Sequence, residues 1–197
     1  MTEQSVIMEN KNKILESAIS VFLEKGFYNS RVEDIAEKAG IAKGTVYLYF
    51  KDKRDLFLSS IRYEIEKFYV KIEEIIKGNL EPQRKLKNLL FIIYSNFYER
   101  KKYYESAIRL WPGELGKEII KTILPYLRKI LKGIGSILKE GENLKVFSIH
   151  QNIYSDSVMI LGIIRAASMA EDFYGKKVSF EKAWNYIKKI LDIKEGG

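Results

Sequence analysis

Apolar residues recur every three or four positions along almost the whole chain, a spacing that fits one face of an α-helix and does not fit a β-strand. The region between residues 11 and 25 follows this rule most clearly. Its apolar positions are Ile14, Leu15, Ala18, Val21 and Phe22. The chain has only three prolines, so long helices can continue without a break. The sequence therefore predicts an all-α fold.

Glycines and polar residues divide this pattern into separate helices. Gly26 is expected to end the first helix, and Ser30, with Glu33 three residues later, is expected to cap the next one. Asp52 is expected to cap a long helix that follows. The predicted helices span about 11–25, 31–39, 43–50, 53–77, 83–102, 103–110, 117–140, 149–174 and 179–193.

Two of these predicted helices are short, and a turn of a few residues around Gly40 separates them. This arrangement is typical of a helix-turn-helix. The turn requires a positive φ, which glycine adopts at the least steric cost. The first short helix carries its apolar anchors at Val32, Ile35, Ala36 and Ala39. The second is expected to present its N-terminal end outward, where it can approach base edges in the major groove.

The position of the positive charge supports a nucleic-acid partner more than its total does. The chain has a formal net charge of +8, but residues 1–55 contain nine Lys/Arg and nine Asp/Glu. Between Lys38 and Arg54, in contrast, there are five basic residues and one acidic residue. We therefore base the prediction of DNA binding on this local cluster and not on the overall basicity.

The run from Ile35 to Phe57, IAEKAGIAKGTVYLYFKDKRDLF, resembles the DNA-binding signature of the TetR (tetracycline repressor) family of transcriptional regulators, and the resemblance covers about residues 12–57. It implies an all-α protein with an N-terminal three-helix helix-turn-helix domain, followed by a C-terminal helical domain for ligand binding and dimerisation. The implied domains are residues 8–68, with a long linking helix at about 53–77, and residues 69–197. The implied partner is a double-stranded, palindromic DNA operator.

The same resemblance implies roles for single residues. Gly44 would let the backbone approach a base, and Thr45 and Tyr47 would contact phosphate or base. Lys53 would hold a phosphate. Leu48 departs from the polar or aromatic residues often found at its position, and an apolar side chain there can contact a thymine methyl group. The expected DNA-binding residues are Arg31, Lys43, Gly44, Thr45, Tyr47, Leu48, Tyr49 and Lys53.

The stretch 153–170 is apolar or small on nearly every side, and only Asp156 and Arg165 in it are charged. A helix that is apolar all round must be buried all round. In a small domain this is easiest if one face meets its own core and another meets a second subunit, although a purely intramolecular core is the alternative. The expected dimer-interface residues are Val158, Leu161, Arg165, Trp184, Ile187 and Leu191.

Aromatic residues are frequent between residues 91 and 154, and as a group they favour a pocket with apolar walls and scattered hydroxyls. For any one of them, core packing is the alternative. The expected effector-pocket residues are Phe91, Tyr94, Phe97, Tyr98, Tyr104, Trp111, Tyr126 and Tyr154. A hydrophobic or amphipathic small molecule is the expected effector, and Arg109 and Arg165 are candidates for recognising an anionic one. The family resemblance implies that such a ligand releases the operator.

Enzymatic and metal-dependent functions have little support. The chain has no cysteine and a single histidine, His150, so we expect no catalytic residue, no metal site and no cofactor. The N-terminus carries acidic residues where a signal peptide is basic, and the longest uncharged stretch has 11 residues, fewer than the roughly 20 that span a bilayer. We therefore expect a cytoplasmic homodimeric repressor without membrane contact. The alternative is a small-molecule sensor or carrier that no longer reads DNA.

Overall fold

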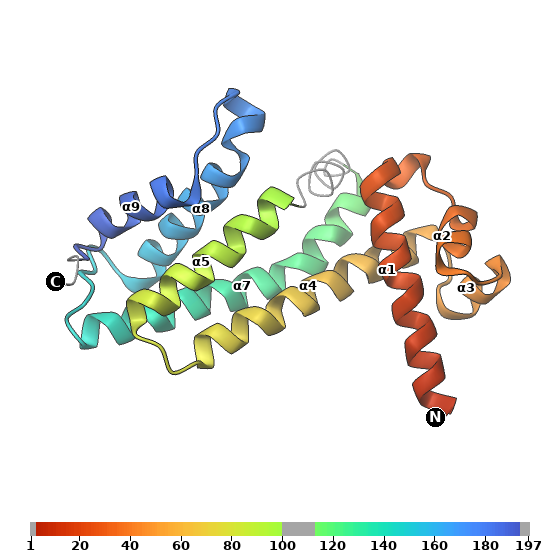
Figure 1. Cartoon of the computed structure of the whole chain (residues 1–197), viewed down its shortest axis with the longest axis horizontal. Helices are drawn as coiled ribbons and strands as arrows, with labels where there is room; N and C mark the ends of the chain where they lie inside the picture. The colour runs from red at the N-terminus through yellow and green to blue at the C-terminus, as the bar shows by residue number, and fades with distance from the viewer. Residues whose placement is uncertain (1–2, 100–112, 194–197) are drawn as a thin grey trace. The chain divides into compact units, whose positions relative to one another are not determined.

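All regular structure in the described part of the chain is helical, as the sequence predicts (Figure 1). The computed structural model describes residues 3–99 and 113–193. Its helices are α1 (Glu3–Asn29), α2 (Val32–Ala39), α3 (Lys43–Tyr49), α4 (Lys53–Lys77), α5 (Pro82–Glu99), α7 (Glu114–Asn143), α8 (Ile153–Tyr174) and α9 (Phe180–Ile190). The helix predicted at about 103–110 lies outside the described residues.

The described residues form two compact units. The first contains residues 3–67 and 113–124, and the second contains residues 68–99 and 125–193. Helices α4 and α7 therefore each begin in the first unit and end in the second. Residues 113–124 join the N-terminal helices in one unit, although they are far from them in the sequence.

The core of the first unit is built from the apolar stripes of α1, α2 and α4, and it fixes α3 from behind. Its buried members include Ile14, Ala18, Phe22, Val32, Ile35, Val46, Phe50, Phe57, Ile61 and, from α7, Ile119. The rings of Phe22 and Phe57 meet edge to face with centroids 4.8 Å apart, a favourable aromatic geometry. Helix α2 packs against both α1 and α3 (Figure 1).

Glycines bend the chain where the sequence predicts, but one cap differs. Gly26 has φ 72° and interrupts α1, and Gly40 has φ 65° between α2 and α3. Ser30 is not the N-cap of α2, because its hydroxyl donates to the carbonyl of Phe27 at 2.8 Å. Arg31 takes that position instead, and its peptide N–H donates to Asp34 Oδ2 at 3.0 Å. The helix therefore begins one residue later than predicted.

The core of the second unit lies among α5, α7, α8 and α9, and α8 packs against both α5 and α9 (Figure 1). Its fully buried side chains include Leu86, Leu89, Leu90, Ile134, Leu138, Ile164 and Ile187. One charged pair is embedded at its edge. Lys85 donates to both carboxylate oxygens of Glu140, at 3.0 and 2.9 Å, which satisfies an ammonium whose side chain is only 10% exposed.

Candidate nucleic-acid interface

Helix α3 is a short, rigidly anchored element. It follows Ala42, whose carbonyl accepts the N–H of Thr45 at 2.9 Å, and it ends where the N–H of Phe50 donates to Val46 at 3.0 Å. Val46 and Phe50 are only 1% and 3% exposed, so they fix one face of the helix in the core. The opposite face is therefore held in position without needing contacts of its own.

That opposite face carries four of the eight residues expected to bind DNA. Lys43, Gly44, Tyr47 and Leu48 are exposed, and Leu48 is 83% exposed despite its apolar side chain. Thr45 and Tyr49 are half-buried. Of the six predicted residues on α3, the structure thus presents four together on one surface and places Thr45 and Tyr49 at its edge.

Nothing in the fold around position 44 requires the residue there to be glycine. It lies inside a helix, where glycine is less favourable than alanine by up to about 1 kcal/mol. A Cβ built at this position would meet no heavy atom within 4 Å. The space beside Gly44 is therefore left open toward the outside of the molecule, as the close approach of a partner would require.

Lys43 is engaged by a carboxylate in the free protein. Its ammonium lies 2.5 Å from Glu33 Oε1 and 5.8 Å from the centroid of the Tyr47 ring. The hydrogen bond to Glu33 raises the pKa of Lys43, and the same bond lowers the pKa of Glu33. A phosphate that binds Lys43 must therefore compete with Glu33.

Lys53 has an internal role that the sequence did not predict. Its ammonium donates to the carbonyls of Ser30 at 2.8 Å and Tyr28 at 3.3 Å, and it lies 4.6 Å from the centroid of the Phe27 ring. Burial lowers the pKa of this lysine. The side chain thus ties the start of α4 to the connection between α1 and α2, and one N–H remains for a phosphate. Arg31 is exposed at the start of α2.

The cations of the first unit are balanced in number by its carboxylates, and about half of them form ion pairs within it. The described residues of this unit contain 13 Lys/Arg and 13 Asp/Glu, whereas those of the second unit contain 16 and 11. Ion pairs within the first unit join Lys25 to Asp34, Lys38 to Glu24, Lys43 to Glu33, Arg54 to Glu118, Lys67 to Glu16 and Lys117 to Glu114. The general electrostatic attraction of this unit for DNA is therefore weak, and recognition must depend on close contacts.

The predicted pocket residues fall in separate places. Tyr94 brings Tyr98 and Phe180 together, with ring centroids 6.1 and 5.8 Å away, and its hydroxyl donates to the carbonyl of Val178 at 2.8 Å. Phe91 joins this group through Phe180, at 5.1 Å. This aromatic cluster is held by internal contacts, as the packing alternative requires.

The other predicted pocket residues do not join that cluster. Phe97 lies below the Arg165 guanidinium, at 5.7 Å, and Tyr126 packs against Tyr69, at 6.2 Å. Tyr154 is 70% exposed at the start of α8. Tyr104, Trp111 and Arg109 lie outside the described residues.

The predicted interface residues divide between core and surface. Trp184, Ile187 and Leu191 are 3%, 0% and 0% exposed, and they belong to the core of the second unit. They have almost no exposed surface with which to contact a second subunit. Their assignment to the dimer interface is therefore replaced by one to the core of their own unit. Val158 and Arg165 are exposed, and Leu161 retains 9% of its surface. The apolar residues of α9 cover the core of their own unit.

Helix α8 nevertheless has an apolar outer face. By length and composition it is apolar enough to cross a membrane, yet only a third of its most apolar window is buried in the unit. Met159 and Phe173 on this face are 68% and 67% exposed. A hollow of about 280 Å³ lies along it. It is lined by Gly162, Arg165, Ala166, Met169, Phe173 and Tyr174. Such a patch marks an interaction surface.

Metal-binding groups are absent from residues 3–99 and 113–193, where no three His, Cys, Asp or Glu side chains come together. His150 has a structural position. Its peptide N–H donates to Asp156 Oδ2 at 3.1 Å, and its ring Nε2 lies 2.5 Å from the carbonyl of Ile190.

Comparisons with known proteins agree with this geometry. A family model described as "Bacterial regulatory proteins, tetR family" matches residues 14–59. The "Fatty acid metabolism regulator protein" of Bacillus subtilis (strain 168) is 39% identical over 132 residues, which is 66% of this chain and 66% of the relative. The uncharacterized HTH-type transcriptional regulator YuxN of the same organism is 31% identical over 103 residues, which is 52% of this chain and 35% of the relative. The chain thus aligns with less than two thirds of the length of these relatives.

Solved structures extend the similarity to the whole fold. The transcriptional regulator FadR from Bacillus subtilis, in complex with stearoyl-CoA, has a TM-score of 0.70 and 26% sequence identity to this chain. The match covers 91% of this chain and 96% of that one.

Proposed function

The chain belongs to the TetR family of bacterial transcriptional regulators, and we propose that it is a repressor that binds a palindromic operator as a homodimer and is released by a long-chain fatty acyl thioester. The observation that carries the first part is the outer face of α3, where exposed side chains surround an open glycine. The assignment of the DNA-reading domain to residues 8–68 and of the ligand and dimer domain to residues 69–197 is part of this proposal.

In this proposal α3 enters the major groove. Gly44 lets the helix backbone approach a base edge, and Lys43 binds a phosphate after it leaves Glu33. Tyr47 contributes its hydroxyl to phosphate or base, and Leu48 contacts a thymine methyl group. Thr45, at the edge of the face, contacts phosphate or base, and Tyr49 adds a hydrogen bond to the DNA backbone. Arg31 and the remaining N–H of Lys53 provide further phosphate contacts.

The outer face of α8 supports a symmetric dimer. A two-fold interface uses the same surface on both subunits. An apolar face that includes Val158, Met159 and Phe173 is complementary to a second copy of itself, and its burial would remove exposed apolar side chains from water. Two copies of α3 then read two half-sites, one helical turn of DNA or more apart.

The nature of the ligand is proposed from two observations. One relative is named for fatty acid metabolism, and a structural neighbour holds stearoyl-CoA. The second unit of this chain combines an apolar core with an excess of five positive charges over its described residues, 16 against 11. An apolar interior with a basic exterior suits a ligand that has a long alkyl chain and an anionic head. Such a ligand is hydrophobic and amphipathic, as the composition predicts.

Two helices carry residues of both units, and one of them, α7, contains Pro125 where the second unit begins. Helices α4 and α7 each contribute to both units. In the first unit, Arg54 Nε of α4 donates to Glu118 Oε2 of α7 at 2.7 Å, and Ile119 is 1% exposed in the core behind α3. The proposed ligand response therefore involves α4 or α7, since residues of both helices pack in the core behind α3.

The proposal is tested by selecting operators from genomic DNA and measuring their binding by fluorescence anisotropy with and without palmitoyl-CoA. We expect one saturable palindromic site that palmitoyl-CoA releases. Tyr47→Ala should lower operator affinity at least about tenfold. Tyr186→Ala, which also removes an exposed tyrosine, is the matched control and should have no effect.

Each part of the proposal can fail separately. A protein that binds palmitoyl-CoA tightly but selects no operator would be a sensor or carrier. An operator that palmitoyl-CoA does not release would leave the DNA-binding assignment intact and contradict the ligand. A strictly monomeric particle at the concentrations of the assay would contradict the dimer.

A further inference from the structure

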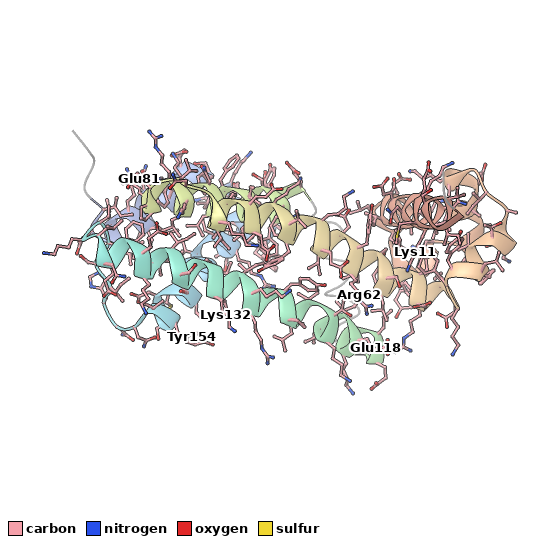
Figure 2. All side chains as sticks on the ribbon, turned by 90° about the horizontal axis from the view of Figure 1, so that it is seen from below. Lys11, Arg62, Glu81, Glu118, Lys132 and Tyr154 are labelled. Atoms are coloured by element: carbon pink, nitrogen blue, oxygen red, sulfur yellow. The ribbon has the colours of Figure 1, made fainter. Side chains whose placement is uncertain are left out.

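The surplus positive charge of the second unit has no role in the contacts described so far. A part of it lies on α7, where Arg128, Lys129 and Lys132 are exposed within little more than one turn. Lys132 extends from the outer side of the helix (Figure 2). Arg128 and Lys132 are four residues apart, so they lie on the same face of α7 with about 6 Å of helical rise between them.

Two tyrosines stand beside these cations. Tyr69 of α4 and Tyr126 of α7 pack edge to face with ring centroids 6.2 Å apart. The ammonium of Lys129 lies 4.8 Å from the Tyr69 centroid and 5.3 Å from the Tyr126 centroid. Both rings are half-buried, so each retains exposed surface. We call these five residues (Tyr69, Tyr126, Arg128, Lys129 and Lys132) the α7 patch.

The cations of the α7 patch are not neutralised locally. Arg128 and Lys132 form no ion pair with any residue in 3–99 or 113–193, unlike Lys117 of the same helix, which pairs with Glu114 at 2.6 Å. Glu73 of α4, whose charge acts on Tyr69, pairs with Lys77 at 3.4 Å. The α7 patch therefore offers net positive charge to a ligand from outside.

The size of the α7 patch argues for a compact polyanion. Stable binding to duplex DNA through its phosphates uses many cations along an extended surface. Here the next cation along α7 after Lys132 is Lys139, which lies seven residues further on, at about 10 Å of helical rise. Three cations beside two aromatic rings suit the phosphates and the base of one nucleotide, because aromatic rings stack on bases and lysine and arginine bind phosphates.

We propose that the α7 patch binds the phosphorylated nucleotide head of the acyl thioester ligand. This inference rests on the proposed function, since it assigns one end of that ligand. Arg128 and Lys132 bind the phosphates, and Lys129, held over Tyr69 and Tyr126, adds a third donor beside the base. The alkyl chain enters the apolar interior of the same unit.

The test compares three probes by isothermal titration calorimetry: palmitoyl-CoA below its micelle concentration, free palmitate, and coenzyme A. The double variant Arg128→Gln/Lys132→Gln should bind palmitoyl-CoA at least about tenfold more weakly and with a smaller salt dependence. Its palmitate affinity should stay within about twofold of wild type, because the alkyl chain does not touch the patch. Coenzyme A should compete with palmitoyl-CoA only in the wild type. Lys139→Gln, on the same helix beyond Gly135, is the matched control.

The outcomes separate the two proposals. If wild-type protein does not bind palmitoyl-CoA, the proposed ligand is wrong and the α7 patch loses its role with it. If the wild type binds and the double variant binds equally well, only the α7 patch is refuted. Equal losses of palmitate and palmitoyl-CoA affinity would also overturn this inference. The thermal unfolding midpoint of each variant shows whether it is folded.

Discussion

Replacing Glu33 by glutamine should strengthen DNA binding and make it more sensitive to salt. In the free protein the Glu33 carboxylate forms an ion pair with the Lys43 ammonium at 2.5 Å, on the side of α3 that we assign to DNA binding. When a phosphate takes this ammonium, Glu33 is left as an unpaired carboxylate near the polyanion. Glutamine keeps the size of the side chain and removes its charge. Lys43 then reaches DNA with its full charge available.

The magnitude follows from counterion release. Each additional phosphate neutralised changes the slope of log K against log salt concentration by about 0.9. In the proposed complex two subunits bind one operator, so the slope should become steeper by up to about 1.8. Between about 50 and 200 mM salt, a fourfold range, this corresponds to an additional loss of affinity of about tenfold in the variant. At the lowest salt the variant should bind every duplex more tightly, whatever its sequence.

The assay is fluorescence anisotropy with the operator and with a scrambled duplex over this salt range. Glu16→Gln is a suitable control, since the Glu16 side chain is 57% exposed, similar to 56% for Glu33, and it pairs with Lys67 away from α3. An unchanged slope in Glu33→Gln would refute the competition between Glu33 and phosphate. The same change in both variants would show that only total charge matters.

Three further results are expected. A Cβ at Gly141 would overlap the ring of Phe147, so Gly141→Ala should destabilise the second unit by about 1–3 kcal/mol in chemical denaturation, and the additional change Phe147→Leu should recover part of the loss. Ile119→Ala should destabilise the first unit by about 2–5 kcal/mol, which hydrogen exchange would detect at α1 and α2; unchanged protection there would contradict its place in that core. The hydrogen bond from Lys67 lowers the pKa of Glu16 from its usual value of 4.5. The ion pair therefore stabilises the first unit fully above about pH 4.5, and this stabilisation is lost as the pH falls through the lower pKa of Glu16 in the folded protein. A thermal midpoint of the first unit that does not fall on acidification below about pH 4.5 would contradict this.

Local signals in the sequence predicted much of the first unit. A positive φ at Gly40 follows from the need to reverse the chain between two short helices, and the structure confirms it. The buried and exposed faces of α3 follow from helical spacing, which places Val46 inside and Leu48 outside. Ser30 shows the limit of such signals. Its hydroxyl could cap the next helix or bond to the preceding turn, and only the folded chain decides between them.

Contacts between distant segments were beyond sequence reasoning. An apolar stripe predicts that a helix face is buried, but it does not say against what, so Trp184 and Ile187 were placed at a subunit interface and lie in their own core. Ile119 gives no local sign that it packs with the N-terminal helices. The roles of Lys53 and Lys129 also depend on carbonyls and rings supplied by other helices.

If the chain is the repressor proposed above, the open space beside Gly44 means that a substitution there can abolish repression without affecting the fold. Gly44→Ala costs the fold nothing in steric terms and favours the helix, so the variant should be at least as stable as the parent. In the proposed dimer it would still assemble with unaltered subunits. In a cell that makes equal amounts of both versions, most dimers would then contain at least one altered subunit, and a single added methyl group would act as a dominant defect.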